Sequence, residues 1–417
     1  MWASNFLWRI SPLFILLIGY AVGVNAFFRV VDAEVLRSLP YIVSFILLGF
    51  SCVFNRSRFV VPVLATLMVY WFIQHRLQTP LTESVTMGLF IALNLIFCCQ
   101  LILVALMPEK GVFNRWGLMA ILVAVLPLLS LATVEESDWL VSHMVALMSP
   151  DQPLSDHYWL SNKLLAVHAC VGCVLMVFAV CKRSATEYAL LLTWMVTVVV
   201  FYDFAEPLIS AVGYSLLMVS LFIILLQSHY HIAFIDPLTG IPGRRALESH
   251  LQTLGKHYVI AMLDVDYFKK FNDTWGHDVG DQVLRMVAAK INRVAGGGKA
   301  FRFGGEEFTV VFNRAGAELC YPYLEEIRNN IDQHKMHLRR SGRHKQSKQG
   351  KKLRGKVAAT REVLSVSISI GIGAGTPGTK PAEVIKTADE NLYCAKRKGR
   401  NRTWPDLSLP ADGKAHG

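Results

Sequence analysis

Charged side chains are scarce in the first half of the chain, where long apolar runs are separated only by short polar breaks. Of the 417 residues, 53% are hydrophobic, more than a soluble protein of this size usually carries. The runs are long enough for about eight membrane-spanning helices. We place these near 9–28, 38–54, 59–74, 87–107, 116–134, 164–181, 187–203 and 208–227. The scarcity of charge therefore excludes a wholly soluble protein and predicts a multi-span α-helical membrane domain over residues 1–228.

Six basic residues lie in alternate breaks between the apolar runs. They are Arg56, Arg58, Lys110, Arg115, Lys182 and Arg183, whereas the intervening breaks carry most of the acids. Loops rich in Lys and Arg stay on the cytoplasmic side of a membrane. This pattern predicts that the N-terminus and the whole second half of the chain are cytoplasmic.

The sequence also lacks a disulfide framework. Most of its eight cysteines lie in or at the ends of apolar runs, and Cys320 and Cys394 fall in predicted cytoplasmic helices. His168, Cys170 and Cys173 could hold a metal inside the sixth run, or they could simply pack there.

No heptad repeat separates the last apolar run from the globular second half. Residues 229–235 are too few for a multi-heptad coiled coil, so we interpret them as a short connector. The membrane helices would then connect directly to a second domain over 236–403.

The second domain places acids at the end of a buried strand. Residues 258–263 are a continuous apolar run that ends in Asp264-Val265-Asp266. Paired acids are costly there unless they bind a cation, and oxygen ligands favour Mg²⁺ or Mn²⁺. A short helix opens at Tyr267, Phe268 and Lys269, and its free N–H groups would bind an anion. A loop carrying Asn272, Asp273, His277 and Asp281 follows, and Asp281 begins the next helix.

A hairpin carries two more acids. Phe301 and Phe303 precede Gly304-Gly305, and alternating apolar residues follow Glu306 and Glu307, as in two half-buried strands. Two glycines suit a tight turn. Taken alone, the two acids fit a solvated turn as well as a cation site.

Further periodic segments complete the domain. A helix is expected over 315–337, a strand over 362–373 and a last helix over 381–397. Lys396 and Arg400, one turn apart, would serve a phosphate site or merely suit a helix C-terminus. This alternation of strands and helices around a hairpin predicts an α/β fold of ferredoxin-like kind.

Five motifs in this order resemble the GGDEF family of diguanylate cyclases. They are "DPLTGIPGRR" from Asp236, "DVDYFKKFNDTWGHDVGD" from Asp264, "RFGGEEF" from Arg302, "SIG" from Ser369 and "AKRKGR" from Ala395. The resemblance covers 236–403 and implies a cytoplasmic domain of nucleotidyl-cyclase type. It implies a homodimer at the bacterial inner membrane that joins two GTP into cyclic di-GMP and releases pyrophosphate.

The resemblance also implies roles for individual residues. Asp264, the carbonyl of Val265, Glu306 and Glu307 would hold two Mg²⁺ or Mn²⁺ ions per site, with Glu306 as general base and Glu307 also catalytic. The phosphates would be bound by the backbone at Tyr267, Phe268 and Lys269 and by Lys396 and Arg400. Asn272, His277 and Asp281 would bind the nucleoside.

Two departures from the family pattern are visible. Gly243 stands where Asn usually precedes the paired arginines, and we expect from it a local stability cost. The inhibitory product site of many members needs Arg-x-x-Asp, but Ala295 and Gly298 occupy those positions. We therefore expect no product inhibition through that site.

Other interpretations stay open. The domain could bind nucleotide as a silent scaffold, or the membrane half could act primarily as a transporter or ligand sensor. Residues 335–356 carry ten Lys and Arg and no acid, which predicts a loop that is solvated or attracted to anionic lipid. Specific nucleic-acid binding is not expected, because no aromatic residues are interleaved for stacking. Residues 404–417 are expected to be a disordered tail.

Overall fold

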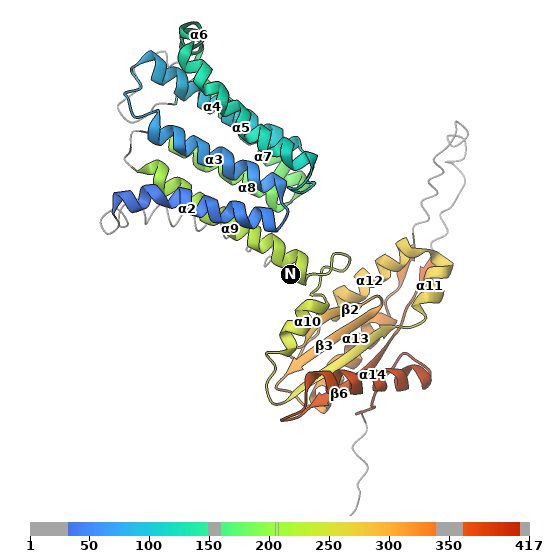
Figure 1. The fold of residues 1–417 in the computed structure, drawn as a ribbon. Coiled ribbons are helices and arrows are strands. Elements are labelled where there is room, and N and C mark those ends of the chain that lie inside the picture. The colour runs from blue at the N-terminus through green and yellow to red at the C-terminus, as the bar shows by residue number, and fades with distance from the viewer. Residues whose placement is uncertain (1–31, 149–159, 205, 207, 339–361, 409–417) are drawn as a thin grey trace, which may run out of the picture. The chain divides into compact units, whose positions relative to one another are not determined.

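The computed structural model describes residues 32–148, 160–204, 206, 208–338 and 362–408 (Figure 1). The chain divides into two compact units, Met1–His229 and Tyr230–Gly417. The helices that begin in the first unit are α2 (Ala33–Val53), α3 (Ser57–His75), α4 (Ser84–Leu106), α5 (Arg115–Glu136), α6 (Asp138–Met148), α7 (Asn162–Lys182), α8 (Ala185–Tyr202) and α9 (Ile209–Phe234).

Within the described residues, six helices are long and apolar enough to cross a membrane, namely α2, α3, α4, α7, α8 and α9. Each coincides with one of the eight predicted spans. The predicted span at 116–134 coincides with α5, of which only Arg115–Pro127 qualifies as a shorter apolar helix, and Pro127 lies inside it. The predicted span at 9–28 lies outside the described residues. The short α6 was not predicted.

Several buried polar groups of the first unit are paired. Arg58 was predicted in a loop, but it lies in α3 and is buried, and its Nη2 is 2.9 Å from Glu187 Oε1 of α8. His168 of α7 contacts Asn94 Oδ1 at 2.9 Å and Cys98 Sγ at 3.4 Å, both in α4. Because Cys170 and Cys173 are exposed and His168 is buried, the three do not form the metal site considered above.

The second unit contains helices and strands in alternation. They are α10 (Arg244–Leu251), β1 (Tyr258–Val265), α11 (Phe268–Trp275), α12 (His277–Ile291), β2 (Lys299–Gly304), β3 (Glu307–Asn313), α13 (Ala317–Asp332), β4 (Met336–Leu338), β5 (Glu362–Leu364), β6 (Ile368–Gly375), α14 (Pro381–Arg397) and β7 (Thr403–Trp404).

The main sheet has the order β2-β3-β1-β6-β7. The first four strands are antiparallel neighbours, and β7 adds to β6 in parallel. Two βα units flanking the β2–β3 hairpin produce this ferredoxin-like order. The α/β prediction for this domain is therefore confirmed.

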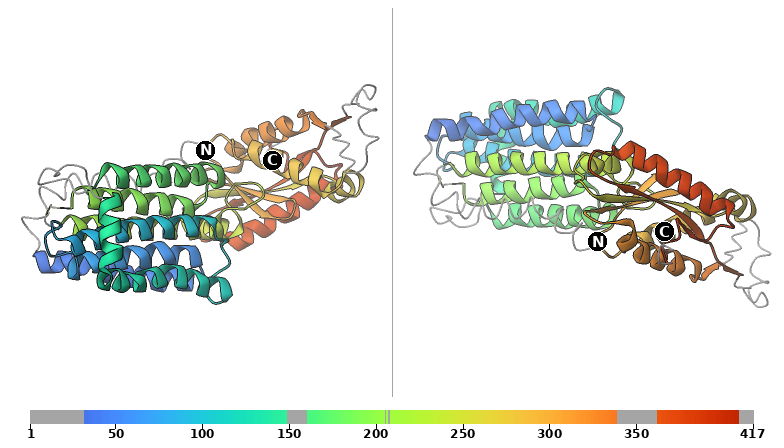
Figure 2. Two further views of the ribbon diagram at one scale, coloured as in Figure 1. Left: turned by 90° about the horizontal axis from the view of Figure 1, so that it is seen from above. Right: turned by 90° about the horizontal axis from the view of Figure 1, so that it is seen from below.

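Helices cover both faces of this sheet. The views of Figure 2 place α13 on one face and α14 on the other. Residues of β1 and β3 that point to the first face pack with α12 and α13, and those that point to the second pack with α10 and α14. The hairpin was predicted to be half-buried, but Phe308 to Phe312 are all buried because each face of β3 has its own helical layer.

Several predicted boundaries were wrong. Asn272 lies in α11 and His277 in α12, so these two residues are helical rather than in a loop, and the helix predicted to begin at Asp281 already begins at His277. Only Gly276, with φ of +83°, separates the two helices. The helix predicted over 315–337 ends at Asp332. The strand predicted over 362–373 is two strands, β5 and β6, with 365–367 between them.

The ends of the second unit also differ from expectation. Residues 230–234, predicted as part of a connector, are the last turn of α9. Trp404 lies in β7, and Asp406 accepts a hydrogen bond from the Tyr321 hydroxyl at 2.9 Å, so the ordered domain extends past residue 403. Met336–Leu338 pairs with Glu362–Leu364, and most of the predicted basic loop lies in 339–361, outside the described residues.

Candidate active site

The antiparallel pairing of β1 with β3 brings the two predicted acidic segments together. Asp264, near the end of β1, pairs across the ladder with Glu307, the first residue of β3. The Val265 N–H donates to the Glu306 carbonyl at 3.4 Å. The sequence alone could not predict that these two segments are adjacent, because α11, α12 and β2 lie between them in the chain. The predicted group of Asp264, Glu306 and Glu307 is therefore at one place in the fold.

The turn between β2 and β3 is fixed by hydrogen bonds from Arg302. Gly305 has φ of +50°, which suits glycine. Arg302 donates to the Gly305 carbonyl from Nε at 3.2 Å and from Nη2 at 2.7 Å, and its Nη1 lies 2.8 Å from Asp236 Oδ1. Asp236 also accepts from Thr239. Although burial alone raises the pKa of Asp236, the hydrogen bonds from Thr239 and Arg302 bring it below its usual value. Arg302 thus ties the turn to the loop before α10, a role that the motif did not reveal.

The two acids at the end of β1, Asp264 within the strand and Asp266 just after it, have different partners. Asp264 is buried, and its Oδ1 lies 2.9 Å from Lys396 Nζ. Asp266 is also buried and accepts from the hydroxyls of Ser367 at 2.7 Å and Ser369 at 2.6 Å. Asp266 is therefore a structural acceptor, whereas Asp264 belongs to the carboxylate group.

The carboxylate group carries more negative charge than its neighbours offset. Burial raises the pKa of Asp264, Glu306 and Glu307 above their ordinary values. The charge of Asp264 raises the pKa of both glutamates further. Lys396 acts in the opposite direction on all three but does not restore the ordinary values. A bound cation would remove this imbalance.

These residues fit a divalent cation that keeps other ligands. Among the residues that the structure describes, no group of three or more His, Cys, Asp and Glu side chains is arranged to enclose a metal ion. Mg²⁺ is commonly held by one or two carboxylates, with water and substrate phosphates as its remaining ligands. Asp264, Glu306 and Glu307 would supply only part of the ligands of such an ion.

The N-terminus of α11 lies directly after β1. Tyr267 precedes the helix with φ of +56°, Phe268 is buried beneath it, and Lys269 is exposed. The first N–H groups of a helix have no intrahelical partner, so they can bind an anion. Arg400 lies beside them, with its guanidinium carbon 4.2 Å from the centre of the Tyr267 ring and Nη1 3.1 Å from the Tyr267 hydroxyl.

The predicted pairing of Lys396 and Arg400 on one helix face was wrong. α14 ends at Arg397, and Arg400 has left-handed backbone with φ of +63°. Lys396 reaches the carboxylates, and Arg400 reaches the start of α11. The two basic residues therefore contact different parts of the site.

The predicted nucleoside-binding residues lie on α11 and α12. The Asn272 Oδ1 atom is buried without a hydrogen-bond partner, and a methyl group added to Gly280 of α12 would overlap it. His277, the first residue of α12, is exposed, and Asp281 is half-buried one turn further on. This buried acceptor therefore receives no hydrogen bond from the described protein groups.

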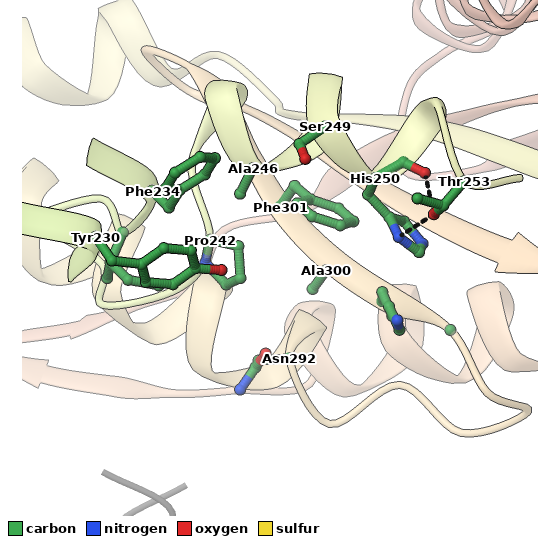
Figure 3. Close-up of a pocket in the computed structure, with 13 residues that line it drawn as sticks. Tyr230, Phe234, Pro242, Ala246, Ser249, His250, Thr253, Asn292, Ala300 and Phe301 are labelled. Carbon is green, nitrogen blue, oxygen red and sulfur yellow. Dashed lines mark hydrogen bonds between the residues drawn. The ribbon is translucent and has the colours of Figure 1, made fainter. Parts of the chain in front are cut away.

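A separate pocket of about 460 Å³ lies on the α10 side of β2 (Figure 3). Tyr230, Phe234, His250 and Phe301 are among its lining residues. None of the predicted site residues lines it. The candidate site is therefore not this pocket but the open junction of β1, the hairpin turn and α11.

Comparison with known proteins agrees with the motifs. A family model described as "Diguanylate cyclase, GGDEF domain" matches residues 233–349 and 345–402. Diguanylate cyclase VdcA of Vibrio cholerae is 32% identical over 177 residues, which are 42% of this chain and 47% of that protein. Response regulator PleD of Caulobacter vibrioides is 35% identical over 185 residues, 42% of this chain and 37% of that protein. The chain thus matches less than half the length of these curated relatives.

A solved structure is also similar. It is the coiled coil and GGDEF domain of DgcB from Caulobacter crescentus in complex with c-di-GMP, with 34% identity, 43% of this chain and 88% of that chain covered, and a TM-score of 0.36. The family model matches the part of the chain that contains β1, the hairpin and α14. Residues 233–402 of this chain belong to the GGDEF domain family.

Proposed function

We propose that this protein is a diguanylate cyclase that condenses two GTP into cyclic di-GMP and two pyrophosphate. The observation that carries the proposal is the group of Asp264, Glu306 and Glu307 at the end of β1, next to the N-terminus of α11 and Arg400. Carboxylates for a cation and N–H groups for an anion, side by side, suit a nucleoside triphosphate. The similarity to proteins named diguanylate cyclase supports the same reaction.

Two divalent ions would be held by Asp264, the Val265 carbonyl, Glu306 and Glu307. When bound, such ions neutralise phosphate charge and lower the pKa of the attacking hydroxyl. Lys396 supplies a fixed positive charge that lowers the pKa of Asp264 and so offsets part of the effect of burial. The N–H groups of Tyr267, Phe268 and Lys269 and the Arg400 guanidinium bind the phosphates.

Glu306 is the proposed general base. It takes the proton from the ribose 3′-hydroxyl of one GTP, whose oxygen then bonds to the α-phosphorus of the other. The bond from that phosphorus to the bridging oxygen breaks, and pyrophosphate leaves. The same exchange in the opposite direction closes the ring, so each product requires two GTP sites and hence a homodimer.

Guanine is the proposed base. Its N1–H and N2–H₂ groups can both donate to the Asp281 carboxylate, and its N–H donors also suit the unpaired Asn272 Oδ1. His277 lies at the edge of the same two helices. Adenine presents an acceptor at N1, so it would leave the carboxylate without a donor.

The first unit is the proposed regulator. Its six long apolar helices support a multi-pass protein of the bacterial inner membrane, and the alternation of basic loops supports a cytoplasmic N-terminus and cyclase domain. Because α9 runs to Phe234, two residues before Asp236, it is the covalent route by which a signal would reach the second unit.

The test is product formation by the full chain in lipid nanodiscs. GTP and Mg²⁺ are added, and the products are separated by chromatography. Cyclic di-GMP and pyrophosphate should form in the ratio of one to two, and Glu306→Gln should abolish both. A wild-type protein that binds GTP without forming product would instead be a silent nucleotide-binding scaffold coupled to a membrane sensor.

A further inference from the structure

Arg400 lies in a strained loop. Gly399, Arg400 and Asn401 have φ of 112°, 63° and 45° in succession. Left-handed backbone is uncommon for residues other than glycine, and it persists only where surrounding contacts hold it. Two such residues, Arg400 and Asn401, follow α14 after Lys398 and Gly399. The contacts that hold them therefore decide where Arg400 points.

Asn401 makes the hydrogen bonds that hold this loop in place. Its N–H donates to Asp266 Oδ2 at 3.0 Å, and its side-chain Oδ1 accepts from Arg328 Nη1 at 2.9 Å. Asp266 is itself fixed by two serine hydroxyls of the β6 region. The loop is thus held by Asp266, which directly follows β1, and by Arg328 of α13.

Arg328 is pre-arranged for this contact. Its Nε donates to both carboxylate oxygens of Glu325 at 3.0 Å, and its Nη2 lies 2.8 Å from Glu325 Oε2. Glu325 also accepts from the Thr403 hydroxyl at 2.6 Å, just after the loop. The Arg328 side chain is only 14% exposed. A planar guanidinium can satisfy Glu325 and Asn401 together, which a lysine cannot do as rigidly.

We propose that Arg328 is a positioning residue for the phosphate site: through Asn401 it holds the left-handed loop that places Arg400 at the N-terminus of α11. This rests on the proposed function, since it assumes that Arg400 binds the phosphates of GTP. Arg328 itself is on α13 and touches no predicted ligand atom. Its effect is carried entirely by the direction of Arg400.

The proposal differs from a purely structural role in two ways. If Arg328 only joined α13 to β7, its loss would weaken the binding of every ligand equally. A positioning role instead weakens the binding of GTP and pyrophosphate while leaving guanosine, which has no phosphate, unaffected. In addition, its effect should disappear once Arg400 has been removed.

The experiment uses the full chain in nanodiscs with four variants: Arg328→Met, Asn401→Gly, Arg400→Met and the double variant of Arg328→Met with Arg400→Met. Asn401→Gly removes the amide that Arg328 holds, but glycine tolerates the positive φ, so it guards against simple misfolding. Lys386→Met is the matched control, because it removes an exposed ion pair with Glu390 on α14.

Binding of a non-hydrolysable GTP analogue, pyrophosphate and guanosine is measured with Mg²⁺. Arg328→Met and Asn401→Gly should each weaken the binding of the GTP analogue and of pyrophosphate by about tenfold, as expected for the loss of a charged hydrogen bond. The binding of guanosine should not change. In the double variant, Arg328→Met should weaken binding little beyond the effect of Arg400→Met alone. Equal weakening of guanosine, or full additivity in the double variant, would overturn the proposal.

Hydrogen exchange gives a second readout that needs no ligand. Arg328→Met should speed amide exchange in the peptide covering 398–402, and Lys386→Met should not. Unchanged exchange there would overturn the positioning role. A wild-type protein that bound no GTP analogue would overturn the proposed function, and the exchange measurement would still decide whether Arg328 holds the loop.

Discussion

The proposed chemistry depends most directly on Glu306, and the negative charge of this residue lowers the stability of the folded protein. Burial and the neighbouring Asp264 raise the pKa of its carboxyl, so ionisation destabilises the folded protein when no cation is present. Native-state stability from this group is full below the ordinary carboxyl pKa and is lost as pH rises through the raised value. The site is therefore expected to be least stable where it is most active.

Replacing Glu306 with Gln should separate these two effects. At pH 8 without divalent ions, we expect the melting temperature of the second unit to rise by about 2 °C, while turnover falls by about 100-fold or more. The gain should vanish at pH 4, where the wild-type carboxyl is protonated. Thermal scans at both pH values, with exposed Glu390→Gln as control, check this; a lower melting temperature at pH 8 would contradict it.

Base choice is a second matter at the residue scale. Asp281 on α12 is expected to accept both donors of the guanine edge, so GTP should be turned over faster than ATP by several orders of magnitude. Asp281→Asn should reduce that preference, because an amide can also donate to adenine N1. Initial rates with each nucleotide measure it. Comparable rates for GTP and ATP in the wild type would rule out this assignment.

At the scale of elements, α10 begins with an imperfect cap. Gly243 is its N-cap residue and has no side chain to accept from the free N–H groups. A Cβ at this position would have no neighbour closer than 3.8 Å, so there is room for a side chain. The departure from the family motif therefore lies at a helix start, where the expected consequence is a local cost in stability.

Gly243→Asn should stabilise the second unit by a few tenths of a kcal/mol, because asparagine caps a helix somewhat better than glycine. Gly243→Ala, which fills the same space without a cap, should lower stability by about 0.5 kcal/mol. Denaturant titrations of the two variants beside the wild type check both signs. Activity per folded molecule should stay the same in all three, and a loss confined to Gly243→Asn would mean that the turn needs glycine.

For the whole molecule, feedback by product should be limited to the active site. Ala295 and Gly298 cannot grip a guanine or a phosphate, and Gly296 and Gly297 between them have positive φ. Arg293 instead lines a pocket of about 290 Å³ with Lys290 and Glu326. Nothing in this arrangement reproduces the Arg-x-x-Asp pair.

Cyclic di-GMP should therefore inhibit only in competition with GTP. Raising GTP should relieve inhibition completely, and Arg293→Ala should not change the inhibition constant. Steady-state rates over a matrix of GTP and cyclic di-GMP concentrations distinguish the cases. Non-competitive inhibition that persists in Arg293→Ala would reveal a different inhibitory surface.

Control is then expected to come from the membrane helices. α9 runs without a break from Ile209 to Phe234 and leaves no coiled coil before the second unit. A fragment starting at Tyr230 should be mostly monomeric and should turn over GTP at least about tenfold more slowly than the full chain, because each product needs two sites. Sedimentation and turnover of both proteins test this. A tight, fully active fragment dimer would show that the membrane helices do not set the dimer.

Patterns that are local in the chain could be predicted from the sequence. The apolar runs, the buried strand β1, the hairpin and α14 follow from hydrophobic periodicity, and the order of strands and helices was enough for the ferredoxin-like topology. Asp264 was identified because paired carboxylates at a buried strand end are costly unless they bind a cation. Glu306 and Glu307 alone fitted a solvated turn as well, so their role came from the resemblance to the GGDEF family.

Contacts between distant segments were decided only by the tertiary structure. Lys396 and Arg400 are four residues apart, yet a left-handed loop sends one to Asp264 and the other to Tyr267. The grip of Arg328 on Asn401, 73 residues away, leaves no periodic signal in either segment. Hydrophobic patterns fix which face of an element is buried, but the partners of a polar side chain depend on which elements the fold brings beside it.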